Sequence, residues 1–381
     1  MRIGIAGPIS PEEIANTLGV SCGGLPKGMG GTAVTSLVAA LARAGHDVVV
    51  YSLSFDVVED IMLQVGPVRM HFGGYRAWAR SRAGDFFRCE REAIARFIRR
   101  DPADVVNAHW SYEFALGALS ECPGAVVTVR DWSPLILRMR PNVYRFVRLL
   151  MDRRCLRLAR HVSCASPYMQ ERLAGHGKDA SLTPNMVSPA AAVGPVRSSL
   201  AGRRIICVAN GYGGRKNVAT LLRALVSLPD CELTLVGNGL GPGEEAHREA
   251  AALGLADRVR CLGQMDHRAT IDAMRDADVM VHPALEESFG NVLVESMAQG
   301  IPVIGGASAG AVPWVLDHGQ AGVLVDVRDP SAISTAVVRL LDDHDEWRRL
   351  SVAGRKRVDE CFSESAVVES YLAVYRKVLG E

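Results

Sequence analysis

The sequence predicts two doubly wound α/β domains joined by a short linker. Short apolar runs, rich in β-branched residues, alternate with helix-like stretches along nearly the whole chain. These runs are continuously apolar, which is typical of parallel strands covered by helices on both faces. The chain has 381 residues, more than one hydrophobic core usually supports, so two domains of similar size are expected.

Six strands are expected in each half of the chain. Those of the first half are RIGIAGP (2–8), DVVVYSL (47–53), VRMHFG (68–73), DVVNAHW (104–110), AVVTVRD (125–131) and HVSCAS (161–166). Those of the second half are RIICVAN (204–210), ELTLVGN (232–238), RVRCLGQ (258–264), DVMVHPA (278–284), PVIGG (302–306) and GVLVDV (322–327). The alternation of strands with helices predicts a parallel sheet in each domain.

The stretch SPAAAVGPVRSSLAGR (188–203) interrupts this pattern and is interpreted as the interdomain linker. We therefore expect an N-terminal domain at 1–190 and a C-terminal domain at 191–362. The tail 363–381 has apolar residues at helical spacing, which predicts a terminal helix. One possible arrangement is that this terminal helix packs back on the N-terminal domain. In such sheets ligands bind beyond the carboxyl ends of the strands.

Charge and cysteine usage bound the class of protein. The formal net charge is +1, but residues 1–190 carry +6 and the remainder −5, which indicates different partners for the two halves. The nine cysteines are scattered and never form a C-x-x-C pair, so neither a disulfide framework nor a zinc site is expected. The N-terminus shows no signal-peptide pattern, and no apolar run approaches the ~20 residues of a membrane helix. These observations favour a cytoplasmic protein.

The stretch KGMGGTA (27–33) contains G-x-G-x-x-A, one form of the dinucleotide-binding fingerprint. That fingerprint belongs in the turn directly after the first strand, whereas Gly28 follows the strand end at Pro8 by about twenty residues. The glycines do open a helix at 32–45 and present backbone N–H groups there, which suits an anion. A phosphate-facing loop of another type is favoured, and a glycine loop without a ligand stays open.

The segment EESFGNVLVESMAQG (286–300) carries the strongest motif. Glu287 lies in a loop after a strand, and Glu295 lies eight positions later, inside a helix that begins near Gly290. Between them the backbone of Phe289 to Asn291 can hold an anion at the positive end of the helix. A phosphate site flanked by two carboxylates suits the hydroxyl groups of a nucleotide sugar. From spacing alone, two solvated glutamates are an equal alternative.

This segment resembles the E-x7-E motif of retaining glycosyltransferase family 4, which has the GT-B fold of two Rossmann-like domains facing a central cleft. The block HPALEESFGNVLVESMAQGIPVIGG (282–306) carries the most specific resemblance. It extends to 311–330, to 28–52 and to TPN (183–185), so it covers nearly the full chain in the family's order. The resemblance implies transfer of a sugar from a nucleotide-diphosphate sugar to an acceptor hydroxyl, with retention of anomeric configuration.

The resemblance assigns most donor contacts to the second domain. Glu287 would contact the donor sugar, Glu295 the nucleotide ribose, and Lys216, in VANGYGGRKN, the donor phosphates. The other donor-binding candidates are Asn210, Arg215, Gly263, Gln264, Phe289, Gly290, Asn291 and Val292. The family often has an arginine at the position of Asn210, which leaves open whether Arg215 replaces it.

In the first domain, Gly30 and Gly31 resemble the family's glycine loop, which approaches the donor diphosphate and the acceptor. His109 ends a strand and is expected to face the cleft. The family's T-x-H-D segment reads TVRDWSP here, so Arg130 stands where a histidine is common. We expect Arg130 near the donor or acceptor. Asp131 either accepts a hydrogen bond from an acceptor hydroxyl or pairs with Arg130.

The expected mechanism is front-side attack, because no carboxylate is placed as the nucleophile of a double displacement. The departing diphosphate would take the acceptor's proton, with Lys216, Arg215 and the helix start at Gly290 stabilising it. The catalytic candidates are thus Glu287, Lys216, His109 and Arg130. No metal and no other cofactor are expected, because D-x-D candidates such as Asp276 to Asp278 precede a strand and have a structural pattern.

Two other functions stay open: a nucleotide-sugar epimerase on this fold, and a nucleotide-sugar-binding protein with impaired catalysis. The donor base, donor sugar and acceptor are also open at this point.

The first domain contains two basic stretches, 76–100 and 138–160, the second with eight arginines and one acidic residue. Such stretches can contact an anionic membrane surface, which for a cytoplasmic protein would be the inner face of the membrane. They can also bind a charged acceptor or be solvated helix faces. No nucleic-acid-binding module accompanies them, so no nucleic acid partner is expected.

Overall fold

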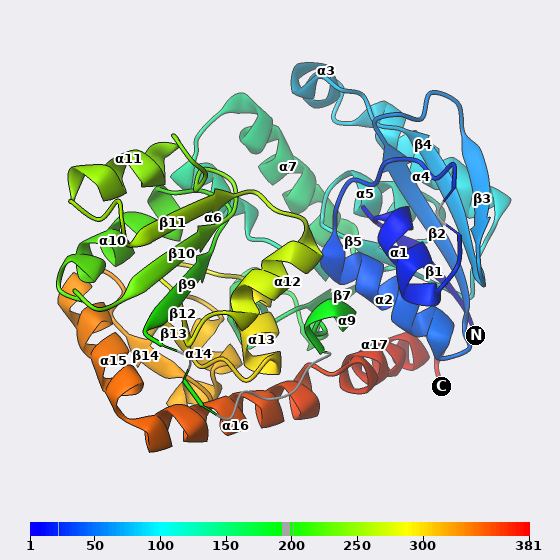
Figure 1. Ribbon diagram of the computed structural model, residues 1–381. Helices are drawn as coiled ribbons and strands as arrows, with labels where there is room; N and C mark the ends of the chain where they lie inside the picture. The colour runs from blue at the N-terminus through cyan, green and yellow to red at the C-terminus, as the bar shows by residue number, and fades with distance from the viewer. Residues whose placement is uncertain (22, 193–198, 201) are drawn as a thin grey trace. The chain divides into compact units, whose positions relative to one another are not determined.

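The computed structural model describes residues 1–21, 23–192, 199–200 and 202–381. The chain divides into two compact units (Figure 1). Unit 1 comprises Met1–Met186 and Glu364–Glu381, and unit 2 comprises Val187–Ser363. The functional division into an acceptor-side and a donor-side domain stays a prediction.

Unit 1 is built on an eight-stranded sheet with the order β3-β4-β2-β1-β5-β6-β7-β8. Its strands are β1 (Arg2–Ala6), β2 (Asp47–Ser54), β3 (Ile61–Val65), β4 (Val68–Gly74), β5 (Val105–His109), β6 (Val126–Val129), β7 (His161–Cys164) and β8 (Ala180–Leu182). The first strand, β1, pairs with β2 on one side and β5 on the other. The winding therefore reverses between β1 and β5, and this is the kind of position where open α/β sheets bind ligands.

Two strands of this sheet were not predicted. β3 pairs antiparallel with β4 through a turn at Gly66, so the expectation of an entirely parallel sheet is wrong at this edge. Its residues alternate between partly buried and exposed positions, and only Val65 is buried, because an edge strand is covered on fewer sides; IMLQV therefore lacks the continuous apolar run used for prediction. β8 has only the three residues ASL, too few to give a pattern.

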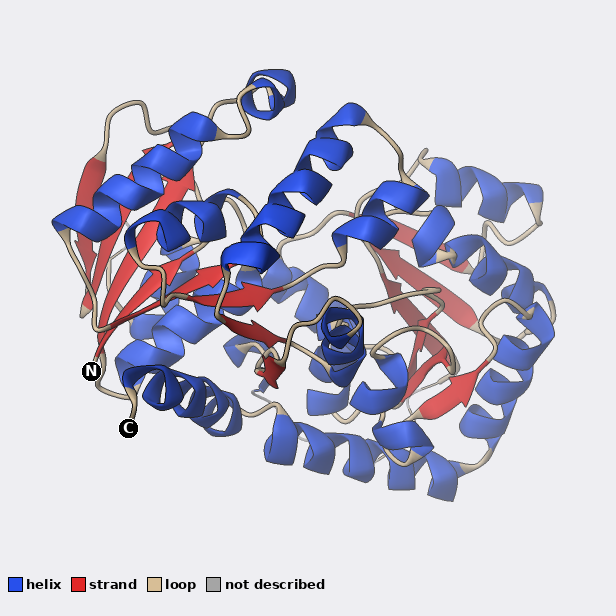
Figure 2. Cartoon of the chain, turned by 180° about the vertical axis from the view of Figure 1, so that it is seen from behind, coloured by secondary structure: helices blue, strands red, loops and turns tan. Residues whose placement is uncertain are grey.

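Helices cover both faces of this sheet (Figure 2). They are α1 (Pro11–Leu18), α2 (Thr32–Arg43), α3 (Ala79–Gly84), α4 (Arg88–Arg100), α5 (Glu113–Glu121), α6 (Ser133–Met139), α7 (Val143–Leu158), α8 (Pro167–Ala174) and α17 (Glu364–Leu379). The terminal helix α17 contacts α2 and β5. Its buried Tyr375 hydroxyl accepts a hydrogen bond of 2.8 Å from Asn107 in β5, which ties the end of the chain to the middle of the sheet.

Unit 2 contains a six-stranded parallel sheet with the order β11-β10-β9-β12-β13-β14. Its strands are β9 (Arg204–Val208), β10 (Glu232–Val236), β11 (Val259–Gly263), β12 (Val279–His282), β13 (Val303–Gly306) and β14 (Val323–Val325). All lie where the sequence predicts strands. The winding reverses between β9 and β12, which pair directly.

The helices of unit 2 surround this sheet. They are α9 (Pro189–Ala192), α10 (Val218–Val226), α11 (Glu245–Ala252), α12 (His267–Arg275), α13 (Asn291–Ala298), α14 (Val312–Val315), α15 (Pro330–Asp342) and α16 (His344–Cys361), with the 3₁₀ turns η1 (Gly214–Lys216) and η2 (Asp317–Gly319). The segment 188–203, predicted to be a linker without regular structure, begins with α9, which contacts α12 and α13. Of that segment, 193–198 and 201 lie outside the described residues.

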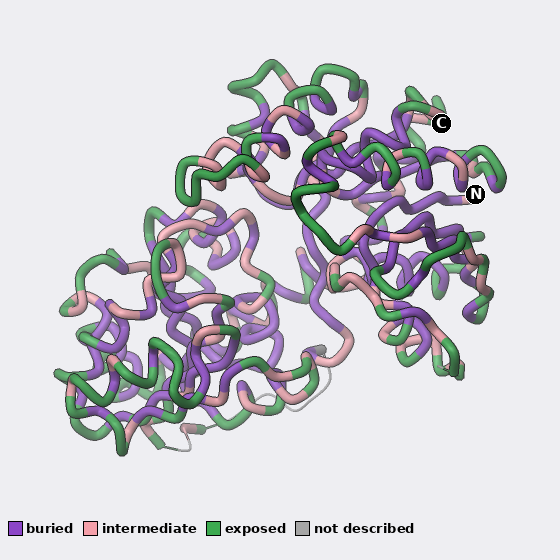
Figure 3. Tube along the Cα trace, turned by 90° about the horizontal axis from the view of Figure 1, so that it is seen from above, coloured by how far each residue is buried: buried purple, intermediate pink, exposed green. Residues whose placement is uncertain are grey.

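Buried residues lie in the interior of each unit, and exposed residues lie on its outside (Figure 3). The continuous apolar runs that predicted the strands form these cores, which is what burial on both faces of a sheet requires. The polar loops at the carboxyl ends of the strands are thereby fixed on a rigid base. No helix within the described part of the chain is long and apolar enough to cross a membrane.

Candidate functional site

In unit 2, the loops that follow β9 and β12 meet at the reversal point of the sheet. The first loop carries Lys216 in η1, and the second carries Glu287. The Leu285 amide donates to the Arg215 carbonyl oxygen at 2.8 Å, which joins the two loops. The Lys216 ammonium donates a hydrogen bond to Oε1 of Glu287. Two residues that are distant in sequence thus form one ion pair.

This pair is buried and ionised. The Lys216 side chain is 15% exposed and that of Glu287 10%. Burial alone would raise the pKa of Glu287, but the neighbouring His282 and the charge of Lys216 outweigh it and hold the pKa well below its usual range. The Nε2 atom of His282 lies 3.3 Å from Oε1 of Glu287. A carboxylate and an ammonium are therefore both charged here near neutral pH.

The start of α13 lies directly after Glu287. Gly290 precedes the helix with φ 94°, a left-handed conformation that disfavours side chains. A Cβ at Gly290 would also lie 2.8 Å from the Leu293 side chain. Asn291 is exposed and Val292 partly exposed, so the backbone N–H groups of this first turn remain near the surface. Such groups favour an anion.

Phe289 has a packing role that the sequence did not indicate. Its side chain is buried and contacts Trp314 and Phe362 edge-on, with ring centroids 6.2 and 5.5 Å away. Only its backbone is left to contribute to a ligand site. The aromatic cluster holds the loop between Glu287 and α13 in place.

The other candidates of unit 2 lie around this centre without joining its ion pair. Glu295 is buried in α13, and its Oε1 lies 2.8 Å from Nε2 of His267. Arg215 forms a 3.2 Å salt bridge with Glu286, so part of its charge is already balanced. Gly263 ends β11 with φ 71°, and Asn210 and Gln264 are exposed.

In unit 1, His109 ends β5 at the reversal point of the sheet and is completely buried, whereas the sequence predicted that it faces a cleft. Arg130 lies just beyond β6, and its Nη2 lies 2.9 Å from Nδ1 of His109. Because a guanidinium can only donate, Nδ1 must accept, and the proton of the neutral ring resides on Nε2. That Nε2 has no hydrogen-bond partner within the described part of the chain. Burial, and then the charge of Arg130, hold the pKa of His109 well below its usual value.

Arg130 has further partners that carry no negative charge. Its Nη1 donates to Oδ1 of Asn185, and its Nη2 donates to the Tyr371 hydroxyl of α17 at 3.0 Å. The sequence left open a pairing of Arg130 with Asp131, and the structure does not show that pairing. Asp131 instead accepts a 2.7 Å hydrogen bond from the Tyr112 hydroxyl. Burial raises the pKa of Asp131.

A second arginine completes this cluster. Arg148 of α7 lies over the Tyr112 ring, 3.6 Å from its centroid, and its Nη1 lies 3.4 Å from Oε2 of Glu113. The Tyr75 hydroxyl lies 3.4 Å from Oε1 of the same glutamate. Unit 1 thus arranges two carboxyl groups, one inward arginine and tyrosine rings at the carboxyl end of its sheet.

These side chains line a cavity of about 430 Å³ within unit 1. Trp110, Phe114 and Tyr144 add aromatic walls, and Asp131 and Glu113 supply carboxyl groups. Gly31 also lines it. Gly31 has φ 83°, and a Cβ there would lie 2.3 Å from the Pro8 carbonyl oxygen, so only glycine brings this loop so close to the end of β1. Gly30 has φ 82° but an open surrounding.

Sequence reasoning missed several members of both clusters. His282 ends β12 just as His109 ends β5, so the pattern that identified His109 could have identified it. Arg148 was grouped with the other arginines of 138–160. Its helical spacing from the half-buried Tyr144 and from the buried Asp152 and Cys155 would have distinguished it as the inward arginine. His267 shows no such pattern.

The D-x-D candidate is structural. Asp278 is buried, its carboxylate accepts from the Arg204 amide at 3.0 Å, and its carbonyl oxygen accepts from the Trp347 indole at 2.7 Å. In the described ranges, no group of three or more histidine, cysteine and acidic side chains is arranged to hold a metal ion.

Two family models match the chain. Residues 30–191 match the model described as Glycosyltransferase Family 4, and residues 197–357 match the model described as Glycosyl transferases group 1. A phosphatidyl-myo-inositol mannosyltransferase of Mycolicibacterium smegmatis is 38% identical over 184 residues, which are 47% of this chain and 46% of the relative. The chain thus spans about half the length of this curated relative.

Solved structures show the same fold over the whole chain. Sucrose-phosphate synthase from Thermosynechococcus elongatus has a TM-score of 0.79 at 22% identity, covering 100% of this chain and 99% of that chain. HepE from Anabaena, in complex with UDP, has a TM-score of 0.66 at 17% identity, covering 99% of this chain and 100% of that chain. At these identities the likeness shows the fold alone.

Proposed function

The chain belongs to the GT-B glycosyltransferases of family 4, and from that premise we propose that it transfers a sugar from a nucleotide-diphosphate sugar to an acceptor hydroxyl, with retention of anomeric configuration. The observation that carries this proposal is the ionised Lys216–Glu287 pair at the reversal point of unit 2, next to the start of α13. UDP is the first donor nucleotide to test, because a protein of the same fold was solved in complex with it.

A diphosphate suits the charges of this site. The Lys216 ammonium is a point cation, and the N–H groups at the start of α13 add the positive end of a helix. Glu287 can accept hydrogen bonds from sugar hydroxyls, and Glu295 from ribose hydroxyls. Arg215 would add charge beside Lys216 if the donor displaced Glu286 from its salt bridge.

In the proposed reaction, the acceptor oxygen forms a bond to the anomeric carbon on the same face from which the diphosphate departs. The bond between that carbon and the diphosphate oxygen breaks, and its electron pair stays with the diphosphate. The acceptor's proton passes to the departing diphosphate oxygen. Lys216 and the start of α13 would stabilise the charge that develops there.

The cavity of unit 1 fits an acceptor that is a neutral, hydroxylated ring. Tyrosine and tryptophan rings supply flat faces, and Asp131 and Glu113 supply oxygens that accept from hydroxyls. The acidic groups balance Arg148 and Arg145, so the lining carries no net charge that would select an ionic acceptor.

We further propose that the reaction needs no metal ion, because Lys216 and the helix start supply the positive charge. Unchanged turnover in a chelator is expected, and its loss would contradict this proposal. A cytoplasmic location is also proposed. The eight described cysteines are all free thiols, which supports a reducing compartment.

The decisive experiment is transfer from a panel of nucleotide sugars, first ranked by thermal shift. Glu287→Ala should reduce turnover by about 10²–10³-fold, the cost of one preorganised electrostatic group. Glu245→Ala, at an exposed position of α11, is the matched control and should leave it unchanged. Unchanged turnover of Glu287→Ala would remove this residue from the site.

The product and the acceptor requirement distinguish the remaining functions. Retention predicts that the new glycosidic bond of the product, examined by NMR, keeps the anomeric configuration of the donor, and an inverted product would defeat the proposed mechanism. Conversion of the donor sugar without an acceptor would favour an epimerase. Donor binding without hydrolysis or transfer would favour a binding protein. Asn210 and Arg130, which depart from the family pattern, are the reason to consider that function. The relatives named above are not described as epimerases.

A further inference from the structure

Large apolar side chains are exposed far more often on unit 1 than on unit 2. Eleven of the fourteen at described positions belong to unit 1, including every exposed aromatic, and the three of unit 2 are valines. Five of them lie on or beside α3, α6 and α7, and we call these the apolar rim: Trp78, Phe86, Met139, Val143 and Phe146. Scattered exposed apolar residues are ordinary, but such a concentration needs a reason.

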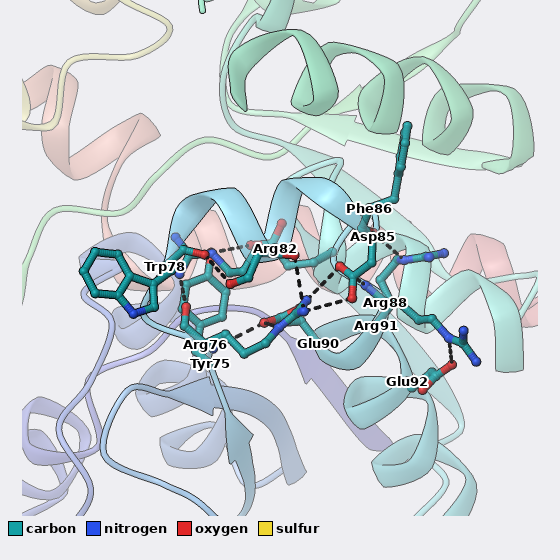
Figure 4. A network of polar contacts seen from close by, with 12 residues as sticks. Tyr75, Arg76, Trp78, Arg82, Asp85, Phe86, Arg88, Glu90, Arg91 and Glu92 are labelled. Carbon is teal, nitrogen blue, oxygen red and sulfur yellow. Dashed lines mark hydrogen bonds and ion pairs between the residues drawn. The ribbon is translucent and has the colours of Figure 1, made fainter. Parts of the chain in front are cut away.

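The segment around α3 is firmly supported from within. Arg76 forms salt bridges with both Asp85 and the fully buried Glu90, at 2.8 and 2.6 Å (Figure 4). The Arg82 guanidinium lies 4.3 Å from the centroid of the Tyr75 ring and donates to the Ala77 carbonyl oxygen at 3.0 Å. This network fixes the backbone on both sides of α3.

Two aromatic side chains point away from this supported segment. Trp78, at the start of α3, is 80% exposed, and Phe86 projects beyond its end (Figure 4). Phe86 and Phe87 have φ values of 54° and 58°, in the left-handed region that such residues rarely adopt. The strained backbone at Phe86 and the ion pairs of Arg76 thus hold this segment in a conformation that leaves Trp78 and Phe86 exposed, whereas Phe87 is buried.

The beginning of α7 extends the same surface. α3 contacts α7, and the Phe87 ring lies 5.9 Å from the Tyr144 ring. Figures 1 and 2 both show α3 and the first turns of α7 at the same edge of unit 1. Val143 is 77% and Phe146 50% exposed on these turns. The five side chains thus lie along neighbouring elements rather than on separate parts of the unit.

Positive charge accompanies the rim. Residues 133–151 contain four arginines and no acidic residue, and Arg138 and Arg140 are exposed beside Met139. Arg80 is exposed beside Trp78. Tryptophan and phenylalanine partition into the headgroup region of a bilayer, and each arginine near an anionic surface adds attraction.

We propose that the apolar rim is a docking surface for an anionic lipid bilayer, with Trp78, Phe86 and Phe146 entering the headgroup region and Arg80, Arg138 and Arg140 contacting lipid phosphates. Its exposed aromatics, together with arginines that form no ion pair within the described part of the chain, fit the headgroup boundary and the phosphates of a bilayer. A second copy would bring an equally positive rim against this one. Tyr144 and Arg145, between Val143 and Phe146, line the cavity of unit 1. The bilayer would then lie beside the acceptor cavity. That consequence rests on the proposed function, but the docking proposal does not depend on it.

The test is co-sedimentation of the full chain with vesicles of phosphatidylcholine, alone or mixed with phosphatidylglycerol. Binding is expected to the mixed vesicles and to weaken at high salt. Trp78→Ser with Phe146→Ser should reduce the partition coefficient at least about tenfold, because burial of the two rings is lost. Arg138→Gln with Arg140→Gln should reduce it about thirtyfold on the mixed vesicles and hardly at all on phosphatidylcholine.

Matched controls come from unit 2. Val226→Ser with Val352→Ser, and Arg260→Gln with Arg348→Gln, change exposed residues of the same classes and should leave binding unchanged. Donor hydrolysis in the absence of vesicles should stay at the level of the unaltered chain in all four variants, which separates loss of docking from loss of catalysis. Equal binding by the rim variants and the unaltered chain would overturn the proposal. So would a dimer in solution that the rim substitutions dissolve, because a second copy would then cover the rim.

Discussion

Units 1 and 2 place polar clusters at equivalent positions of their sheets, beside the point where the winding reverses, but they hold these clusters in different charge states. In unit 2, Lys216 and Glu287 are both ionised, and the pKa of Glu287 is held well below its usual range. In unit 1, burial favours the neutral forms: it lowers the pKa of His109 and raises that of Asp131. Of the two arginines in this cluster, Arg130 bonds to neutral groups, and Arg148 lies over the Tyr112 ring and pairs with Glu113.

This difference corresponds to two kinds of ligand. A charged pair can exchange its internal ion pair for a diphosphate and the hydroxyls of a sugar without changing protonation state. The cavity of unit 1, lined by phenols and by the carboxyl groups of Asp131 and Glu113, suits hydroxyls, to which the phenols can donate and from which the carboxyl oxygens can accept. The proposed donor site in unit 2 and the acceptor cavity in unit 1 follow from that contrast.

The largest expected effect comes from breaking the charged pair of unit 2. Lys216→Met would leave the buried Glu287 carboxylate without its cation, and removing one partner of a buried pair typically costs about 3–5 kcal/mol. Urea denaturation measures this free energy of unfolding. The same variant should lose about 10²–10³-fold in turnover, because the developing charge on the diphosphate loses its cation.

A double substitution tests whether charge is the cause. Lys216→Met with Glu287→Gln removes both charges and should recover a large part of the lost stability, but none of the lost turnover. If the double variant were as unstable as the sum of its single variants, the two charges would not be coupled in the way the structure indicates.

In unit 1, Arg148→Met is expected to have a smaller effect, about 2–3 kcal/mol. Glu113 keeps the Tyr75 hydroxyl and Asp131 keeps the Tyr112 hydroxyl as partners, so less uncompensated charge is left, although the contact of Arg148 with the Tyr112 ring is lost. The Michaelis constant for the acceptor should rise about 10–100-fold while donor hydrolysis persists. Arg153→Met, at an exposed position of the same helix, is the control. Equal effects of the two substitutions would place Arg148 outside the cavity's function.

The two clusters also differ in how far the sequence predicted them. Lys216, Glu287 and Gly290 lie in short motifs at the ends of strongly apolar strands, so a linear pattern contains them. The six strands of unit 2 were predicted for the same reason. The cluster of unit 1 joins single residues from α5, α7 and the ends of β4 and β6, and no local pattern links Arg148 to Tyr112 or Asp131. β3 and β8 were missed because an edge strand and a three-residue strand do not produce continuous apolar runs.

The glycine loop of unit 1 offers a matched pair of substitutions with a smaller effect. Gly31→Ala meets both an unfavourable φ and a clash with the Pro8 carbonyl oxygen, and should cost about 2–3 kcal/mol. Gly30→Ala has a nearly equal φ but no neighbour within contact distance, so it should cost about 1 kcal/mol. Thermal or urea unfolding measures both. Equal costs would show that the close approach of this loop to the end of β1 is not required.

The smallest expected effect concerns pH, and it separates the two charge states directly. The folded chain keeps His109 neutral, whereas the unfolded chain protonates it below its usual pKa of 6.5. Below that pH the unfolded state therefore binds more protons, so stability is lost as pH falls, by at most about 1.4 kcal/mol per pH unit for this one group. His109→Gln cannot take up the proton, and its curve of unfolding free energy against pH should be flatter between pH 6.5 and 5.

For Glu287, whose pKa is lowered in the folded chain, the stabilisation is present above its usual pKa of 4.5 and is lost only as pH falls below that value. Glu287→Gln should therefore change the slope only in that more acidic range. Parallel curves for His109→Gln and the unaltered chain between pH 6.5 and 5 would mean that the imidazole takes up a proton in the folded state, and the contrast between a neutral and an ionised cluster would fail at its most buried residue.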